Sequence, residues 1–363
     1  MDRRRVGLLF GGRSVEHEVS LASATSVLGA LDPDRYDITL IAIAPDGSWH
    51  LGSPALPPGA AITGEEVSLP ANPASRSLVS VSGRDLEAAA DLDVIFSVIH
   101  GAGGEDGSLQ GLLDMAGIAY VGSGVLGSAV QMDKDVSKRL LAAAGIPVVP
   151  WITVRAAVLR HDAATEAERV ISALGLPLFV KPANLGSSVG ISRVAEHAEL
   201  LPALHEAARY DAKILVERGL DAREIEVALL GNDPIEASVP GEIRTDHEWY
   251  DYEAKYADDA TELIVPAPLS DEQTRHVQNL AIGAMRALEG SGIGRADFLL
   301  DNSTGEFFVN EVNSLPGFTE SSMYPRLWEA SGLPYPTLLD RLIELALERH
   351  DERSALSTVY RSD

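Results

Sequence analysis

The sequence predicts a protein of mixed helices and strands, α/β in its N-terminal part and α+β over the chain as a whole. We expect two or three domains that share a cleft. At 363 residues, the chain is longer than one typical hydrophobic core can organise. At its N-terminus, an apolar run ending in Gly-Gly, a helical stretch and a second apolar run occupy 5–12, 16–32 and 36–44. This βαβ order predicts a parallel sheet in the N-terminal part of the chain.

The elements expected after this unit follow from composition and periodicity. Residues 45–84 are rich in Pro, Gly and Ser, which indicates a surface excursion that can hold short strands. The apolar run 91–100 restores the sheet, and 101–117 is a loop that leads into a short helix. One continuous helix is expected over 123–144, and Gly145 with two prolines then marks a crossing between domains.

The remainder of the chain alternates between the two periodicities. The expected helices are 162–174, 196–208, 271–289 and 335–349. The expected strands are 177–181, 213–217, 223–230, 234–240, 292–301 and 305–313. The acidic, aromatic stretch 244–263 has no clear period, and it is either a lid or a solvated surface loop.

Composition excludes several classes of protein. The chain lacks cysteine, so disulfides, thiolate zinc sites and cysteine nucleophiles are excluded. It has 54 Asp and Glu against 29 Lys and Arg, which argues against nucleic acid as a partner. An anionic substrate is therefore expected only where basic residues or metal ions are locally concentrated.

The hydropathy of the sequence predicts neither a membrane span nor an export signal. No apolar run approaches the roughly 18–20 residues that a membrane helix needs. The basic and apolar N-terminus superficially resembles a signal peptide, but Arg13 and Glu16 follow too soon and no cleavage site is suitably placed. The expected location is the cytoplasm, with no membrane partner.

The last two predicted strands carry a cluster of oxygen ligands. Glu311 and Asn313 lie two residues apart and therefore project from one face of their strand. Arg295 and Asp297 share a face of the preceding strand, so antiparallel pairing would bring Asp297 close to Glu311 and Asn313. Such hard oxygen donors suit Mg²⁺ that shares its coordination sphere with phosphate. The alternative is an ordinary exposed strand face.

Four further features have a functional and a structural interpretation. Lys181 and the Gly/Ser loop 184–190 could hold a phosphate or form a simple hairpin loop, but they are not a Walker A motif. The turn 218–220 could bind an adenine edge, with Glu224 on a ribose, or be mere architecture. Lys134 is a solvated helix residue by default. Glu16 could favour a helix N-terminus or hold a substrate ammonium.

The order of these features resembles the ATP-grasp superfamily. Within it, the stretches GGRSVEHEVS, HGAGGEDG, KPANLGSSVG, YDYEAKY, GRADFLLD and NEVNSLPGFTESS resemble the D-alanine:D-alanine ligases, and the likeness runs in order from about Val6 to Pro325. The resemblance implies a three-domain ATP-grasp protein. It comprises an N-terminal α/β domain over 1–124, a central subdomain over 125–214 and a catalytic domain over 215–363.

The resemblance also implies an activity. Members of the family use ATP to activate the carboxylate of one D-alanine as an acyl phosphate. The amine of a second D-alanine then displaces phosphate, giving D-alanyl-D-alanine for peptidoglycan precursors. The implied cofactors are two Mg²⁺ or Mn²⁺ ions, with assistance by K⁺ left open, and the implied assembly is a homodimer.

The roles that the resemblance implies are carried over position by position. Among the implied ATP-binding residues, Lys134 and Lys181 hold ATP phosphates, and Lys255 and Arg295 hold the transferring phosphoryl group. The rest of the nucleotide is bound by Glu217, Leu220, Glu224 and Phe308. The metal ions are bound by Asp297, Glu311 and Asn313. For the first D-alanine, Glu16 anchors the ammonium group, His100 lines the subsite, and Ser187 and Tyr256 join Glu16 in closing the site. Arg295 and Gly317 stabilise the oxyanion of the tetrahedral intermediate. Ser322 and Met323 receive the carboxylate of the second D-alanine.

Two rival functions remain open at this stage. One is a different ATP-grasp ligase, including one that accepts D-lactate, although the presence of Tyr256 favours dipeptide synthesis. The other is a catalytically inactive regulator that binds nucleotide, which fits poorly with an intact set of metal ligands.

Overall fold

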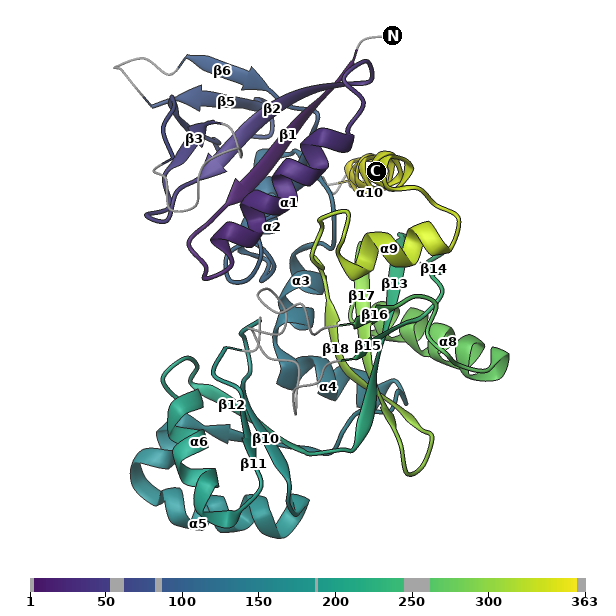
Figure 1. The fold of residues 1–363 in the computed structure, drawn as a ribbon. Coiled ribbons are helices and arrows are strands. Elements are labelled where there is room, and N and C mark those ends of the chain that lie inside the picture. Colours follow the sequence, from purple (N-terminus) through teal and green to yellow (C-terminus); the bar gives the residue numbers. More distant parts are fainter. Residues whose placement is uncertain (1–2, 53–61, 82–86, 187–188, 245–261, 358–363) are drawn as a thin grey trace, which may run out of the picture.

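Three separate β-sheets organise the chain in the computed structural model (Figure 1). The structure describes all residues except 1–2, 53–61, 82–86, 187–188, 245–261 and 358–363. The three sheets follow one another along the chain, and the mixed α/β class predicted from the sequence is confirmed. Within the described ranges, no helix combines the length and apolarity needed to cross a bilayer.

The first sheet has eight strands in the order β6-β5-β4-β3-β2-β1-β7-β8. Its elements are β1 (Arg4–Gly11), α1 (His17–Ala30), β2 (Tyr36–Ile43), β3 (Trp49–Leu51), β4 (Glu66–Ser68), β5 (Ser77–Ser80), β6 (Ala88–Asp91), β7 (Val94–Ser97), α2 (Ser108–Ala116) and β8 (Ala119–Tyr120). The buried strand β1 pairs in parallel with β2 and β7, which confirms the predicted βαβ unit. Short antiparallel strands within the predicted excursion extend one edge of this sheet.

The single helix expected over 123–144 is wrong, because the chain forms two helices there. These are α3 (Val125–Met132) and α4 (Lys134–Ala143), separated by Asp133 in an extended conformation (φ −83°, ψ 98°). The Asp133 side chain accepts a hydrogen bond from the backbone N–H of Val136, so it caps the N-terminus of α4. The break makes Lys134 the first residue of the second helix.

The second sheet is antiparallel, in the order β11-β10-β12-β9. Its elements are β9 (Trp151–Arg155), α5 (Ala156–Leu174), β10 (Leu178–Pro182), β11 (Ser192–Val194), η1 (His197–Glu199), α6 (Leu200–Ala207) and β12 (Lys213–Arg218). Helix α5 begins six residues before the expected start at 162, and Asp162 interrupts its helical geometry. The helices α5 and α6 cover the sheet and share a separate apolar core with it. Strand β12 ends at Arg218, beyond the domain boundary expected at 214.

The third sheet is antiparallel and carries the predicted hairpin. Its elements are β13 (Ala222–Gly231), β14 (Glu236–Ala237), β15 (Gly241–Arg244), β16 (Glu262–Ile264), α8 (Asp271–Ala287), β17 (Gly292–Asp301) and β18 (Phe307–Asn313). The strand expected at 234–240 is reduced to the two residues of β14. Helix α8 begins with a capping box between Ser270 and Gln273, and it packs on β13, β14, β17 and β18.

The C-terminal helices join the first sheet to the third. They are α9 (Met323–Ala330), which sequence analysis missed, and α10 (Tyr335–Ser354). Phe318 lies between them and the first sheet, with ring centroids 5.7 Å from Phe96 and 5.7 Å from Tyr324. All three side chains are almost fully buried and belong to one apolar core. This core fixes the end of the segment 314–318, which follows β18.

Candidate active site

The predicted pairing of the last two strands is confirmed. Asp297 lies opposite Glu311, and Arg295 lies opposite Asn313. The Asn313 amide donates a hydrogen bond of 2.8 Å to Asp297 Oδ2. The Arg295 guanidinium donates two bonds of 2.7 Å, one to each oxygen of the same carboxylate. The strand register therefore brings two carboxylates, an amide and a guanidinium onto one face.

A β-bulge near Asp297 adds one polar side chain to this face. The register of the pairing shifts between Asp297 and Phe298, so Asn310 is an extra residue in β18. Asn310 accepts a hydrogen bond of 3.1 Å from Lys181 of the second sheet. The bulge therefore connects Lys181, which is predicted to bind phosphate, to the metal face, the side of β17 and β18 that carries Asp297, Glu311 and Asn313. The strict alternation of side chains along a strand does not predict this connection.

A second acid holds Arg295, and sequence analysis missed it. Glu226 of β13 is buried and lies across the sheet from Asp297. Its Oε1 atom is 3.1 Å from Arg295 Nη2. Burial opposes the charge of Arg295, but Asp297 and Glu226 outweigh it and raise the pKa of the guanidinium well above its usual range. Strand alternation could have predicted this position, because Glu226 lies two residues after Glu224 and therefore shares a strand face with that predicted nucleotide-binding residue.

The structure contradicts the default interpretation of Lys134 as a solvated helix residue. Its side chain is 11% exposed, and its ammonium lies 3.1 Å from Glu311 Oε2. The same ammonium donates a hydrogen bond of 2.8 Å to the carbonyl oxygen of Leu185, in the Gly/Ser loop. Lys134 therefore connects α4, this loop and the predicted metal face.

Lys181 belongs to a buried cluster with Glu217 and a further lysine, Lys138. The two oxygens of Glu217 lie 2.6 Å from Lys181 Nζ and 2.8 Å from Lys138 Nζ. Burial alone would raise the pKa of Glu217, but the two lysines lower it to about 2. The family resemblance assigns Glu217 to the nucleotide site. Lys138 was not among the predicted site residues, although it follows Lys134 by one helical turn.

Glu16 and His100 lie close together beneath the first sheet. Glu16 occupies the N-cap position of α1 without a side-chain capping hydrogen bond, and it is 9% exposed. A Cβ atom added to Gly101 would lie 2.7 Å from the Oε2 atom of Glu16. A Cβ at Gly186 would lie 3.6 Å from the same oxygen, which places the Gly/Ser loop beside Glu16. Burial lowers the pKa of the His100 imidazole, although the charge of Glu16 opposes this.

Glu105 is a third titratable group at this position, and sequence analysis did not single it out. It lies within the quoted stretch HGAGGEDG, so the signal was available. The backbone N–H of Gly101 donates a short hydrogen bond to Glu105 Oε2. Burial and the neighbouring Glu16 carboxylate raise the pKa of Glu105 to about 8. Glu105 therefore carries a proton at neutral pH.

The raised pKa predicts how Glu105→Gln changes the pH dependence of stability. The native state holds the Glu105 proton up to about pH 8, whereas a glutamate in the unfolded chain ionises near 4.5. The unfolded state therefore releases this proton at lower pH, and native stability falls from about pH 5 to pH 8. Glutamine cannot ionise, so the variant should gain melting temperature over wild type at pH 8 relative to pH 5, in thermal unfolding followed by circular dichroism.

The exposed Glu329 provides the control for this experiment. Glu329→Gln makes the same substitution on α9, outside the cluster, and should leave the slope of melting temperature against pH close to that of wild type. Equal slopes for Glu105→Gln and wild type would show that Glu105 does not hold the proton.

The turn after β18 brings Gly317 to Ser322. A Cβ atom at Gly317 would lie 3.3 Å from Ser322 Oγ, and Ser322 precedes the first turn of α9. The Ser322 hydroxyl accepts a hydrogen bond of 3.1 Å from the backbone N–H of Thr319. Met323 is 5% exposed and its side chain packs in the shared core, so only its backbone is available at this turn.

The expected nucleotide residues divide into described and undescribed positions. Leu220 lies in the turn between β12 and β13, and it is half-buried, as are Glu224 on β13 and Phe308 on β18. The charge of Glu224 contributes to raising the pKa of Lys181, which places the two groups near each other. Ser187, Tyr256 and Lys255 lie outside the described residues.

The donor set fits Mg²⁺ or Mn²⁺ better than a metal that needs a complete protein cage. Asp297, Glu311 and Asn313 supply oxygen atoms, and no cysteine or histidine is among them. Over the part of the chain that the structure describes, no group of three or more His, Cys, Asp and Glu is arranged to hold a metal. Two carboxylates and an amide suit an ion whose remaining ligands are water and phosphate.

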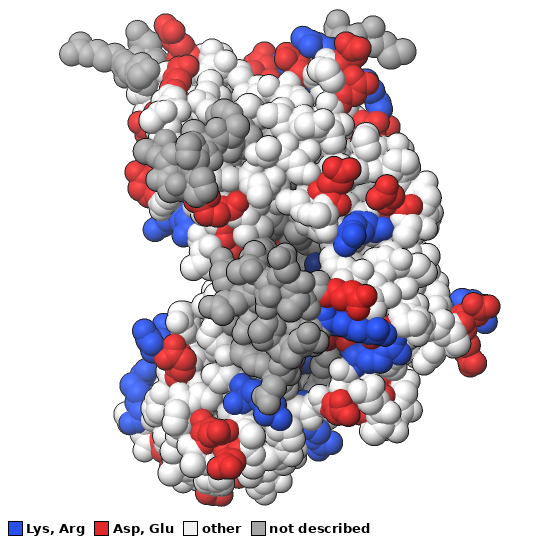
Figure 2. Space-filling view, in the orientation of Figure 1, with Lys and Arg blue, Asp and Glu red and all other residues white. Residues whose placement is uncertain are grey.

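Basic side chains occur at the waist of this acidic molecule. On the face shown in Figure 2, Lys and Arg (blue) are visible on either side of the narrow waist, where Asp and Glu (red) lie beside them, and both kinds also occur above and below it. The lysines and Arg295 of the site add cations in the interior, next to the predicted metal face. This local concentration is the feature that an anionic substrate requires.

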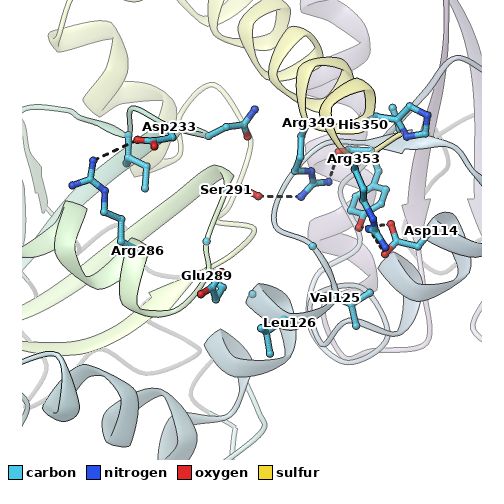
Figure 3. A pocket seen from close by; sticks show the side chains of 17 residues that line it. Asp114, Val125, Leu126, Asp233, Arg286, Glu289, Ser291, Arg349, His350 and Arg353 are labelled. Atoms are coloured by element: carbon cyan, nitrogen blue, oxygen red, sulfur yellow. Dashed lines mark hydrogen bonds and ion pairs between the residues drawn. The ribbon is translucent and has the colours of Figure 1, made fainter. Parts of the chain in front are cut away.

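A separate cavity of about 660 Å³ lies between α3, the turn after α8 and α10 (Figure 3). Its arginines are already engaged. Arg353 pairs with Asp114 at 2.6 Å, and Arg349 donates a bond of 3.0 Å to Ser291 Oγ. None of the predicted site residues lines this cavity, so the candidate active site is the polar face of β17 and β18.

Comparison with known proteins identifies relatives along nearly the whole chain. Family models described as the D-ala D-ala ligase N-terminus and C-terminus match residues 5–123 and 140–344. A D-alanine--D-alanine ligase from Heliobacterium modesticaldum is 46% identical over 365 residues, covering 99% of this chain and 98% of the relative. A D-alanine--D-alanine ligase A from Bradyrhizobium diazoefficiens is also 46% identical, covering 99% of this chain and all of the relative.

Two solved structures share the fold. The D-alanine-D-alanine ligase from Coxiella burnetii has a TM-score of 0.84 and 37% identity, and the match covers 98% of this chain and 97% of that one. The VanG D-Ala:D-Ser ligase from Enterococcus faecalis has a TM-score of 0.83 and 32% identity, with coverage of 95% and 100%.

Proposed function

Because the chain belongs to the D-alanine–D-alanine ligase family, we propose that it joins two D-alanine molecules to D-alanyl-D-alanine at the expense of ATP. The observation that carries this proposal is the meeting of three features at one place. Lys134 and Lys181 lie against the face of Asp297 and Glu311, and Arg295 lies on that same face. Such a site can hold the phosphates of ATP and a metal ion beside the substrate carboxylate that accepts the phosphoryl group.

The chemistry requires an activated carboxylate, since a free carboxylate is a poor electrophile. A carboxylate oxygen of the first D-alanine attacks the γ-phosphorus of ATP, and the bond to the β-γ bridging oxygen breaks to release ADP. The amine of the second D-alanine then attacks the carbonyl carbon of the acyl phosphate. Phosphate leaves with the electrons of the C–O bond, and the attacking nitrogen loses a proton. This sequence would supply a dipeptide to peptidoglycan precursor synthesis.

The cations of the site would supply the binding energy for ATP. In the proposal, Lys134 and Lys181 hold ATP phosphates, and Arg295 holds the transferring phosphoryl group together with Lys255. A cation about 4 Å from a phosphate oxygen contributes roughly 4 kcal/mol at an effective dielectric near 20, before desolvation costs. More distant acids matter less, since charges beyond about 10 Å are largely screened.

The metal ligands in the proposal are Asp297, Glu311 and Asn313. Two Mg²⁺ or Mn²⁺ ions bound there would neutralise phosphate charge and help to align the in-line transfer. The purine would lie near Glu217 and Leu220, with Glu224 and Phe308 lining the rest of the nucleotide site.

The two amino acids would bind next to each other, with the amine of the second facing the reacting carbonyl group of the first. Glu16 would hold the first ammonium beside His100, with Ser187 and Tyr256 closing the site. Gly317 and Arg295 would donate hydrogen bonds to the oxyanion, a contact that contributes about 3 kcal/mol in other enzymes. The second carboxylate would bind at Ser322 and the backbone of Met323, where the N-terminus of α9 favours negative charge.

The proposal extends to domains, assembly and location. We divide the chain into three domains near residue 124 and at residue 218, because β12 continues to Arg218. An enzyme that consumes ATP is expected in the cytoplasm. A homodimer is proposed from the family resemblance, and exposed Met115 and Leu126 on the adjacent helices α2 and α3 are candidates for its contact face.

The decisive experiment is phosphate release from ATP and Mg²⁺ with a panel of acceptors. Wild-type protein should release phosphate with D-alanine, in equal amount to a dipeptide identified by mass, and not with L-alanine. D-Serine and D-lactate belong in the panel, since one solved structure with this fold is a D-Ala:D-Ser ligase. A faster reaction with either of these as second substrate would contradict the proposed specificity. ATP binding without phosphate release would indicate an inactive regulator.

A further inference from the structure

The chain uses lysine sparingly and places it in buried positions. The sequence has five lysines and 24 arginines. Four of the lysines lie in the described residues, and their side chains are between 1% and 11% exposed, each with a carboxylate within 4 Å. Lysine is among the residues that are least often buried. A buried lysine in this chain therefore requires a specific physical reason.

Lys138 is the most buried of the four, and it is paired with Glu217. It is 1% exposed, and its ammonium is 2.8 Å from Glu217 Oε1. The other oxygen of Glu217 is 2.6 Å from the Lys181 ammonium, and the Glu217 side chain is itself 4% exposed. One carboxylate therefore lies between two ammonium groups, of which only Lys181 also reaches Asn310.

The charges of this cluster explain why two lysines are present. Glu217 with Lys181 alone would be a neutral pair, and it would offer little attraction to a phosphate. Lys138 supplies a second positive charge, which the adjacent Glu217 carboxylate favours although burial lowers the pKa of the ammonium, so the three side chains together carry one net positive charge. Because the cluster is buried, this charge is screened less than a surface charge would be.

We propose that Lys138 is a positioning residue that neutralises Glu217 and thereby leaves the charge of Lys181 available to the phosphates of the nucleotide. The inference rests on the proposed nucleotide site and assigns a role within it to a residue that does not itself contact the nucleotide. Lys138 also holds the Glu217 carboxylate in place, which fixes the Lys181 ammonium near Asn310.

Lys138→Met tests this role through nucleotide binding, measured by titration calorimetry in EDTA with ATP, ADP and adenosine. Methionine is unbranched and fills much of the space of the lysine stem. The variant should bind ATP roughly tenfold more weakly, because the cluster loses its net charge near the phosphates. The loss for ADP should be smaller, and the loss for adenosine smaller still, because adenosine carries no phosphate.

A double variant and a matched control separate charge from structure. Lys138→Met with Glu217→Gln restores the net charge of the cluster, so the ratio of ATP to adenosine affinity should return close to that of wild type. Lys213→Met removes another buried lysine from the same strand as Glu217, one whose ammonium contacts Asp133 and lies 3.6 Å from Asp135. It should lower the melting temperature while leaving the affinity ratio unchanged.

Two results would overturn the inference. An equal loss of affinity for ATP and adenosine in Lys138→Met would show that Lys138 only maintains the shape of the site. An affinity ratio that stays low in the double variant would show that the charge of Lys138 is not what matters. If wild-type protein bound adenosine as tightly as ATP, the proposed phosphate site would itself be contradicted, and this inference with it.

Discussion

Replacing Arg295 with methionine should lower kcat by about three orders of magnitude, the range seen when an arginine that stabilises a transferring phosphoryl group is removed. In the proposed reaction, Arg295 acts twice, first on the phosphoryl group and then on the tetrahedral oxyanion. Asp297 and Glu226 hold its guanidinium from two sides, at 2.7 and 3.1 Å. The effect should be measured as ADP release at saturating ATP and D-alanine.

The control for Arg295→Met is Arg223→Met on the neighbouring strand β13. Arg223 also forms a two-point bond to a buried glutamate, Glu242, at 2.8 and 2.9 Å. Both variants remove a guanidinium from a carboxylate that it binds at two points, and both should lose stability, although Glu242 keeps a second guanidinium, that of Arg244, at 3.2 Å. Only Arg295→Met should lose most of its kcat. Similar kcat values for the two variants would contradict a direct role for Arg295 in the reaction.

Glu311→Gln should weaken the binding of the divalent metal by at least about 100-fold, since the loss of groups that merely support a metal ligand already costs up to that factor. Glutamine keeps an oxygen donor but removes the charge that favours a divalent ion. Binding of Mn²⁺ to the complex with ADP should be followed by electron paramagnetic resonance. The concentration of Mg²⁺ that gives half-maximal activity should rise in parallel.

Asp301→Asn provides the comparison for this metal titration. Asp301 ends β17, and its carboxylate accepts hydrogen bonds of 2.6 and 2.7 Å from Ser303 in the hairpin turn. It lies on the strand that carries Asp297 but at the far end of the hairpin. Its variant should bind Mn²⁺ as wild type does. A Glu311→Gln protein with unchanged Mn²⁺ affinity would remove Glu311 from the set of metal ligands.

The parts of the site that could be predicted depend on short-range periodicity. Glu311 and Asn313 share a strand face because side chains alternate, and the adjacent hairpin sets the register with Asp297. Each of these inferences uses residues within about twenty positions of one another. The polar face of the hairpin therefore follows from the sequence alone.

The features that were missed depend on contacts between distant segments or on local irregularities. The burial of Lys134 and Lys138 depends on where α4 packs, which the composition of the helix does not reveal. The bulge that presents Asn310 is one extra residue and leaves no signal in the hydrophobic pattern. The helix break at Asp133 is a cap in the middle of a helical pattern, and it was mistaken for an interior position.

The core around Phe318 has a consequence for how the molecule can be divided. The first sheet and the helices α9 and α10 bury one set of side chains together, although they come from opposite ends of the chain. A fragment ending near residue 124 would expose that surface to water and would lack its partner for cooperative folding. The second sheet encloses a core of its own, formed from residues 152–216. Autonomous folding in this chain is therefore expected of the middle segment, whereas the two ends of the polypeptide behave as one thermodynamic unit.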